Sequence, residues 1–305
     1  MQKKIGIVLA LVLSFIVAVP AASAQETVHI VHELGEAVVP KNPETVVVFD
    51  YAALDILEQL GVEPAGVVKA SLPPYLSDFK DDKYADIGTL FEPNFERIYA
   101  LQPDVILVSA RQATVYPELA KIAPTVYLTI DTDDYWGSFA YNARTIAGIF
   151  EKEDEVEAVL AELAEDFARV NKLASASGLR TLILMANDGA MSVYGPGSRF
   201  GVIHNEFGFA PADTNIDTAN HGQNISYEYL LKVNPDVILV IDRAATVGGS
   251  VTAEQVLDNP LVKMTTASKE GQIYYLSSEV WYTASGGLQS TRIMIDDVLQ
   301  VFAEE

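Results

Sequence analysis

The pattern of apolar and polar positions predicts one α/β unit that occurs twice in the chain. The stretch PDVILVSARQAT at 103–114 recurs as PDVILVIDRAAT at 235–246. Each copy holds a short apolar run rich in valine and isoleucine, which predicts a strand that is covered on both faces. An amphipathic segment precedes each run, and Asn94 and Ser226 are suited to cap the two helices. Two such units in equivalent positions predict two similar α/β lobes.

The segment between the two copies predicts a helix that joins the lobes. Residues 150–176 have helical periodicity and contain neither proline nor glycine. A helix of about 24 residues is roughly 36 Å long, enough to reach across both lobes. An ordinary surface helix within one domain is the alternative, but the position midway between the copies favours the joining helix. Further strands are predicted at Thr45–Phe49, Thr125–Leu128, Thr181–Met185 and Ile273–Leu276.

The predicted fold is therefore α/β, with two similar lobes built on central, mainly parallel sheets and a ligand cleft between them. We expect an N-terminal lobe at 25–149, the linking helix at 150–176 and a C-terminal lobe at 177–305. A chain of this length exceeds what one hydrophobic core usually serves, which also favours two domains.

The first 24 residues have the pattern of a secretory signal peptide. Lys3 and Lys4 precede an apolar run at 5–19, and small residues follow up to Ala24, after which we expect cleavage. The run is shorter than the roughly 20 residues of a spanning helix, so no stable membrane insertion is expected. The chain has no cysteine, and hence neither disulfides nor a lipid-carrying cysteine. We expect a freely soluble, exported, monomeric protein of the periplasm.

The net charge of the chain disfavours some classes of binding partner. Its formal net charge is −22, which disfavours nucleic acid and anionic membrane surfaces. Only eight arginines are present, so the position of each is informative. Arg111 and Arg243 follow the ends of the two equivalent strands, and ligands of parallel sheets bind beyond the carboxyl ends of strands. The repeat therefore predicts that each lobe offers an arginine to one anion in the cleft.

Arg199 is a third candidate for anion binding. It follows the glycine-containing turn at 195–197 and is expected to open a helix, whose N-terminus favours anions. A simple turn between a strand and a helix is the alternative. The glycine spacing fits neither the dinucleotide fingerprint nor the P-loop.

Two further polar side chains lie in loops of the second lobe. His221 stands in NHGQNIS, and Tyr282 follows a predicted strand in EVWYTASGG. Taken alone, the histidine is explained by solvation and the tyrosine by packing. The other histidines have no ligand spacing with His221, so a zinc site is not predicted. Ser285 lacks the G-x-S-x-G pattern of a serine hydrolase.

Glu96 and Glu228 occupy equivalent positions in the two repeat helices. Each lies seven residues before the repeat proline, in the first turn of its helix. The helix dipole alone explains an acid there. Because a helix antiparallel to its strand begins where the strand ends, both glutamates should lie on the cleft side of their lobes. They are candidates for a docking surface.

Several of these stretches resemble one known family over the whole chain after residue 24. SARQATVY, YGPGSRFGVIH, NHGQNIS, PDVILVIDR and VWYTASGGL are similar to periplasmic siderophore-binding proteins of ABC importers, especially the branch for ferric catecholates. The resemblance implies that Arg111, Arg199 and Arg243 line the ligand pocket, while His221 and Tyr282 bind iron(III) directly. It also implies delivery of the ligand to an inner-membrane ABC permease, with no permanent cofactor and no catalytic residues.

The chemistry of a ferric catecholate agrees with this resemblance. A bis-catecholate supplies four oxygens to a metal with six positions, so an imidazole and a phenolate would complete the shell. The resulting complex is anionic, and three arginines can offset its charge. Three alternatives stay open: the same fold with haem or a cobalamin, the same fold with a hexadentate siderophore, and, less favoured, a cleft hydrolase that uses Ser285.

Overall fold

The computed structural model describes residues 25–217 and 222–303, and its first sheet is wholly parallel. The strand order is β5-β4-β3-β6-β7, with all four pairings parallel. Every residue of β3, β6 and β7 is buried, as expected for strands covered on both faces. The bounds are Val46–Val48 for β3, Gly66–Val67 for β4, Ala85–Asp86 for β5, Val105–Val108 for β6 and Thr125–Tyr127 for β7.

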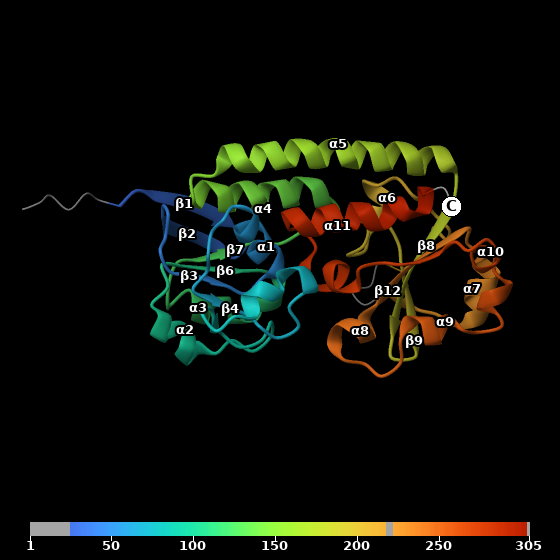
Figure 1. The fold of residues 1–305 in the computed structure, drawn as a ribbon, viewed down its shortest axis with the longest axis horizontal. Helices are drawn as coiled ribbons and strands as arrows, with labels where there is room; N and C mark the ends of the chain where they lie inside the picture. The colour runs from blue at the N-terminus through green and yellow to red at the C-terminus, as the bar shows by residue number, and fades with distance from the viewer. Residues whose placement is uncertain (1–24, 218–221, 304–305) are drawn as a thin grey trace, which may run out of the picture.

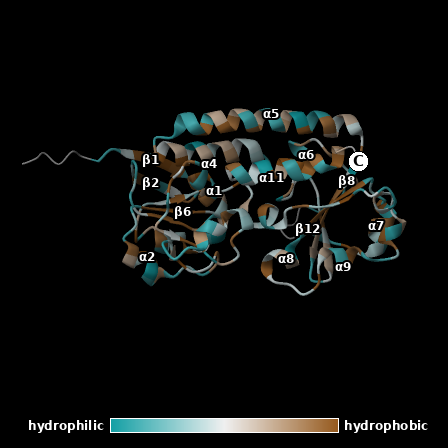
Figure 2. Cartoon of the chain, in the orientation of Figure 1, coloured by the Kyte–Doolittle hydropathy of each residue, from teal (hydrophilic) through white to brown (hydrophobic). Residues whose placement is uncertain are grey.

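The second sheet is parallel at its centre and antiparallel at one edge. The order is β11-β9-β8-β12-β13, and β10 pairs with β8; β9 runs antiparallel to β8 and β11 antiparallel to β9. Figure 2 shows hydrophobic residues along the central strands β8 and β12. The bounds are Arg180–Asn187 for β8, Ala190–Tyr194 for β9, Ala210–Pro211 for β10, Gln223–Asn224 for β11, Val237–Asp242 for β12 and Ile273–Tyr275 for β13. The predicted fold class, two α/β units with mainly parallel sheets, is confirmed.

The helices of the repeat begin where the sequence predicts. Helix α2 is Phe95–Leu101, and Asn94 caps it by accepting a hydrogen bond from the Arg97 amide at 3.0 Å. Helix α7 is Tyr227–Val233. Ser226 stands at the N-cap position, but its side chain accepts no hydrogen bond from the helix.

A 25-residue helix, α5 (Glu153–Ser177), extends along both sheets (Figure 1). Its buried side chains recur at helical spacing and are Val156, Leu160, Leu163, Phe167, Val170 and Ala174. Helices α4 (Tyr135–Ile149) and α11 (Leu288–Leu299) pack against it. Helix α11 also packs on α1 (Tyr51–Gln59), so the end of the chain returns to the first sheet. The lobe boundaries given above stay a prediction.

The remaining elements are mostly short and were mostly not predicted from the sequence. Strands β1 (Thr27–His32) and β2 (Gly35–Pro40) form an antiparallel hairpin ahead of the first sheet. The short helical segments are η1 Pro74–Lys80, η2 Ala110–Val115, α3 Tyr116–Leu119, α6 Val202–Asn205, α8 Arg243–Val247, α9 Ala253–Leu257, η3 Val262–Met264, α10 Thr266–Lys269, the π-helical turn η4 Val280–Ala284 and η5 Gln300–Phe302. No helix within the described ranges is long and apolar enough to cross a membrane. The predicted signal peptide lies outside these ranges.

Candidate functional site

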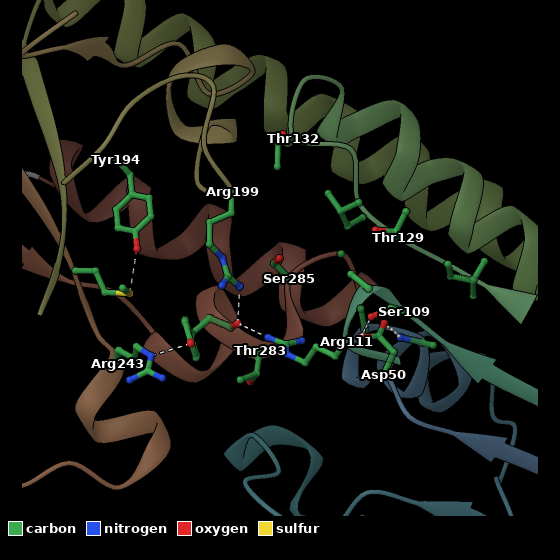
Figure 3. Close-up of a pocket in the computed structure, with 18 of the residues that line it drawn as sticks. Asp50, Ser109, Arg111, Thr129, Thr132, Tyr194, Arg199, Arg243, Thr283 and Ser285 are labelled. Atoms are coloured by element: carbon green, nitrogen blue, oxygen red, sulfur yellow. Dashed lines mark hydrogen bonds between the residues drawn. The ribbon is translucent and has the colours of Figure 1, made fainter. Parts of the chain in front are cut away.

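A cavity of about 620 Å³ lies where residues from both sheets meet. Figure 3 shows Arg111, Arg199 and Arg243 around this cavity, with Asp50 and Ser109 close to Arg111. Ser109 and Arg111 follow the carboxyl end of β6, and Arg243 follows the carboxyl end of β12. The structure therefore places the two repeat arginines in one cavity, at the strand ends where ligands of parallel sheets bind.

Arg111 is held by the short helix η2 that follows β6. Gln112 is buried, and its side-chain oxygen accepts a hydrogen bond from the Ser109 amide at 3.1 Å. This bond fixes the start of η2, from which Arg111 reaches the cavity. The Arg111 Nη2 atom donates to the backbone oxygen of Tyr282 at 3.0 Å.

Arg243 is the first residue of α8. The Asp242 side chain caps α8 by accepting from the Ala245 amide at 2.9 Å. Arg243 Nη1 donates to the side-chain oxygen of Asn187 at 2.7 Å, and its Nε donates to the phenolic oxygen of Tyr282 at 2.7 Å. Two acceptors thus fix the plane of this guanidinium.

Arg199 lies in a turn rather than at the start of a helix, which corrects the prediction from sequence. Helix α6 begins only at Val202 and has four residues, too few to give a helix dipole of consequence. The turn is closed by a hydrogen bond from the Ser198 amide to the Gly195 oxygen at 3.1 Å. Gly201 is required because a Cβ there would collide with the backbone oxygen of Pro196. The guanidinium itself, and not a helix N-terminus, is what this loop offers to an anion.

Arg199 completes the set of cationic groups in the cavity. Its Nη2 atom donates to the Tyr282 backbone oxygen at 2.7 Å, and its Cζ lies 4.7 Å from the centre of the Tyr282 ring. The pKa of Arg199 is lowered, first by desolvation and then by the charge of Arg111. The three arginines repel one another, and an anion between them relieves that repulsion.

Tyr282 is the residue on which all three arginines converge. It lies in the π-helical turn η4, a rare local structure that is frequent at functional sites. The turn is anchored by Trp281, which is 1% exposed and donates through Nε1 to Asp297 at 2.8 Å. The sequence placed Tyr282 after a strand but did not predict the π turn, which presents both its backbone oxygen and its phenol to the cleft.

Glu96 and Glu228 do not line the cavity, whereas Ser285 does. His221 lies outside the described residues. Glu96 and Glu228 are exposed in the first turns of α2 and α7. Ser285 lines the cavity, but no histidine is among the described lining residues that could activate it.

Several lining residues were not predicted from sequence. Asp50 and Asn187 stand at or just after the ends of β3 and β8, and Thr129 follows β7. Ligands of parallel sheets bind beyond the carboxyl ends of the strands, and this rule, which pointed to Arg111, applies to these residues too. A single polar residue after an apolar run is nevertheless a weak signal in a sequence. Among the described lining residues the only charged ones are the three arginines and Asp50, so the cavity favours a ligand with net negative charge.

Comparison with known proteins places this geometry in context. The family model for periplasmic binding proteins (Peripla_BP_2) matches residues 46–280. The chain is similar to the petrobactin-binding protein YclQ of Bacillus subtilis, with 48% identity over 90% of this chain and 88% of that protein. It is 35% identical to the ferric-anguibactin-binding protein FatB of Vibrio anguillarum, over 88% of this chain and 85% of FatB.

Solved structures agree with the sequence comparisons. The crystal structure of YclQ superposes with a TM-score of 0.90 at 47% identity, over 92% of this chain and 100% of that chain. The periplasmic catecholate-siderophore binding protein VctP of Vibrio cholerae superposes with a TM-score of 0.86 at 36% identity, over 90% and 100%.

Proposed function

Because the chain belongs to the periplasmic binding protein family, we propose that it captures a ferric catecholate siderophore and delivers it to an ABC permease. The observation that carries the proposal is the convergence of three arginines on Tyr282 in one cavity. In this proposal the signal peptide is cleaved after Ala24, and the protein acts in the periplasm as a monomer and without catalytic residues.

The arginines suit an anionic ligand better than the acceptor that they now contact. Arg111 and Arg199 both donate to one neutral carbonyl oxygen. An anionic oxygen attracts a guanidinium more strongly than a neutral carbonyl oxygen does, because the attraction between opposite charges adds to the hydrogen bond. A catecholate complex therefore gains from turning these guanidinium groups toward its own oxygens. The cavity volume is within the usual range for small-molecule sites.

Tyr282 and His221 complete the proposed binding of iron. Arg243 donates to the phenolic oxygen of Tyr282, which fixes the position of that oxygen in the cavity. A phenolate is a suitable ligand for ferric iron in the transported complex. His221 enters the proposal through the resemblance of its loop alone.

The test is a titration of the purified protein with the ferric complex of a tetradentate bis-catecholate. We expect saturable binding with quenching of tryptophan fluorescence, because Trp281 adjoins Tyr282. Haem, a cobalamin and a hexadentate tris-catecholate complex are titrated in parallel. Binding of haem or the cobalamin, with no binding of either ferric catecholate, overturns the proposal.

A further inference from the structure

The loop that carries Arg199 is joined end to end by hydrogen bonds. The Ser198 hydroxyl donates to the Gly195 oxygen at 2.7 Å, near the start of the loop. At the far end, the Asn205 side chain donates through Nδ2 to the Pro196 oxygen at 2.9 Å. Because both ends are tied to the same turn, a displacement of Asn205 also displaces the backbone just before Arg199.

Glu206 follows this loop and fastens it to helices α4 and α5. Its Oε1 atom accepts a hydrogen bond at 3.1 Å from the amide of Trp136, in the first turn of α4. Its backbone oxygen accepts at 2.8 Å from the side chain of Asn171, which belongs to α5. The next residue, Phe207, is buried, and its ring centre lies 4.7 Å from that of Phe167 in the same helix. The end of the loop is therefore held from two sides.

Helix α4 begins directly after another part of the cavity wall. Thr129 and Thr132 line the cavity and lie in the segment that joins β7 to α4. Figure 3 shows Thr132 and Arg199 on two different segments around the cavity. The bond of Glu206 therefore connects two parts of the wall, the loop of Arg199 and the segment of Thr132.

The start of α4 does not account for an acid at this position. Asp134 already caps the helix by accepting from the Gly137 amide at 3.0 Å. The Oε2 atom of Glu206 is buried and has no hydrogen-bond partner among the described residues, which is costly for a polar atom. Burial raises the pKa of the Glu206 carboxyl, the bond from the Trp136 amide lowers it, and the charge of Asp134 raises it again. What the contact achieves is to hold the loop of Arg199.

We propose that Glu206 is a positioning residue for ligand binding, which holds the loop of Arg199 against the repeat unit of Arg111 so that both arginines reach one ligand. This inference rests on the proposed function and adds a residue from outside the cavity. Glu206 is not among the described residues that line the cavity, so it acts through the loop and not by contact with the ligand. A side chain that is held in place before binding loses less conformational freedom when the ligand arrives.

The test separates the length of the Glu206 side chain from its charge, by titration with a ferric bis-catecholate. Glu206→Gln keeps an oxygen that can accept from the Trp136 amide, and we expect wild-type affinity. Glu206→Asp keeps the charge but is one methylene shorter, and Glu206→Ala removes the acceptor. We expect both to weaken binding roughly 3- to 30-fold, within the range for residues coupled in one network. Thermal unfolding shows which variants are folded, and the aspartate variant serves if the alanine variant is not.

A double variant distinguishes positioning of Arg199 from a general loss of order. When Arg199→Ala has already removed the guanidinium, adding Glu206→Asp should not weaken binding further. The matched control is Glu162→Ala, which removes an acid that bonds Arg292 between α5 and α11, away from the cavity lining. This control should bind the ligand as tightly as the wild type.

The outcomes separate this inference from the proposed function. If the wild type does not bind the ferric bis-catecholate, the proposed function fails. If the wild type binds it and Glu206→Asp binds it equally well, the positioning role is wrong while the proposed function stands. The same conclusion follows if Glu206→Gln is as weak as Glu206→Asp, or if the losses from Arg199→Ala and Glu206→Asp add in the double variant.

Discussion

At the scale of single residues, the three arginines of the cavity contact two different parts of Tyr282. Arg111 and Arg199 share its backbone oxygen, whereas Arg243 donates to its phenol. Replacing any one of them by alanine should weaken binding of a ferric bis-catecholate by about 1.5–3 kcal/mol, as expected for hydrogen bonds to charged groups. Replacement by lysine should recover only part of the lost binding free energy, because the planar guanidinium geometry is lost. Isothermal titration of each variant measures this.

A surface arginine provides the matched control. Arg144 pairs with Glu157 on the exposed side of α4 and α5, so Arg144→Ala should leave the affinity unchanged. Full affinity in all three cavity variants would contradict the assignment of the arginines.

The phenol of Tyr282 gives a separate prediction. The substitution Tyr282→Phe removes the oxygen that accepts from Arg243 but leaves Arg243 bound to Asn187. If the phenolate binds iron, affinity for a tetradentate complex should fall and its charge-transfer absorption should shift, because water replaces a ligand. A hexadentate siderophore already occupies all six coordination positions of the iron, so the affinity for its ferric complex should change much less. Equal losses for both complexes, with an unshifted band, would refute direct ligation.

The sequence predicted those site residues that carry a repeated or extended signal. Arg111 and Arg243 stood out because a long stretch recurs around them, and Arg199 and Tyr282 because their surrounding motifs resemble a family. Asp50 and Asn187 carry no such signal. Their importance depends on which strand ends lie side by side, and the pairing of β3, β6, β8 and β12 is a property of the fold.

At the scale of elements, the start of α11 depends on a buried acid from α1. Asp55 is 0% exposed and accepts hydrogen bonds from the amides of Gln289 at 2.9 Å and Ser290 at 2.7 Å. The Tyr75 hydroxyl donates to the same carboxyl at 3.0 Å. Gly286 precedes the helix with a φ of +102°, and a side chain there would press on Ile130. The close approach of α11 to the first sheet therefore needs both the glycine and the acid.

The titration of Asp55 should be visible in the pH dependence of stability. Burial raises its pKa from 3.8 to about 6. The folded protein therefore holds this proton more tightly than the unfolded chain, and the free energy of unfolding falls as pH rises from about 4 to about 6. The shift corresponds to about 3 kcal/mol. In Asp55→Asn this loss should be absent.

The comparison of Asp55→Asn with the wild type isolates this one group. Other buried acids titrate in both proteins, so their effect cancels in the difference between the two free energies of unfolding. Denaturant unfolding of both proteins at pH 4, 5, 6 and 7 measures this difference. The free energy of unfolding of the variant minus that of the wild type should rise by about 3 kcal/mol between pH 4 and pH 7. Parallel curves would show that Asp55 does not titrate in this range.

The elements missed from sequence are short or locally unusual. The β8–β9 hairpin turns through Asp188 and Gly189, both with positive φ, and Asp-Gly is a known hairpin signal. The sequence pattern predicted a strand at Thr181–Met185 but not its antiparallel partner β9. The π turn at 280–284 has no sequence pattern of its own and is stabilised by Asp297, which lies on another helix.

At the scale of the whole molecule, each half of the fold places an acid at a helix start of the other half. Asp55 of α1 accepts from the start of α11, and Glu206, which follows α6, accepts from the Trp136 amide at the start of α4 at 3.1 Å. Helix α5 extends along both sheets above them (Figure 1). These contacts link the two repeat units on either side of the cavity that holds the three arginines.

Each repeat unit also carries one exposed acid in the first turn of its helix. Glu96 and Glu228 are exposed in the first turns of α2 and α7 and lie outside the cavity lining. We predict that Glu96→Ala with Glu228→Ala leaves ligand affinity intact and weakens docking to the permease by roughly 2- to 30-fold, the range for two exposed ion pairs. The matched control is Glu118→Ala with Glu254→Ala, which removes two exposed first-turn acids from α3 and α9. Siderophore-dependent growth of an iron-limited strain that lacks its own copy, together with ligand titration of each purified variant, measures both effects. Growth equal to wild type in the first pair, or an equal defect in the control pair, would show that the permease does not recognise these two glutamates.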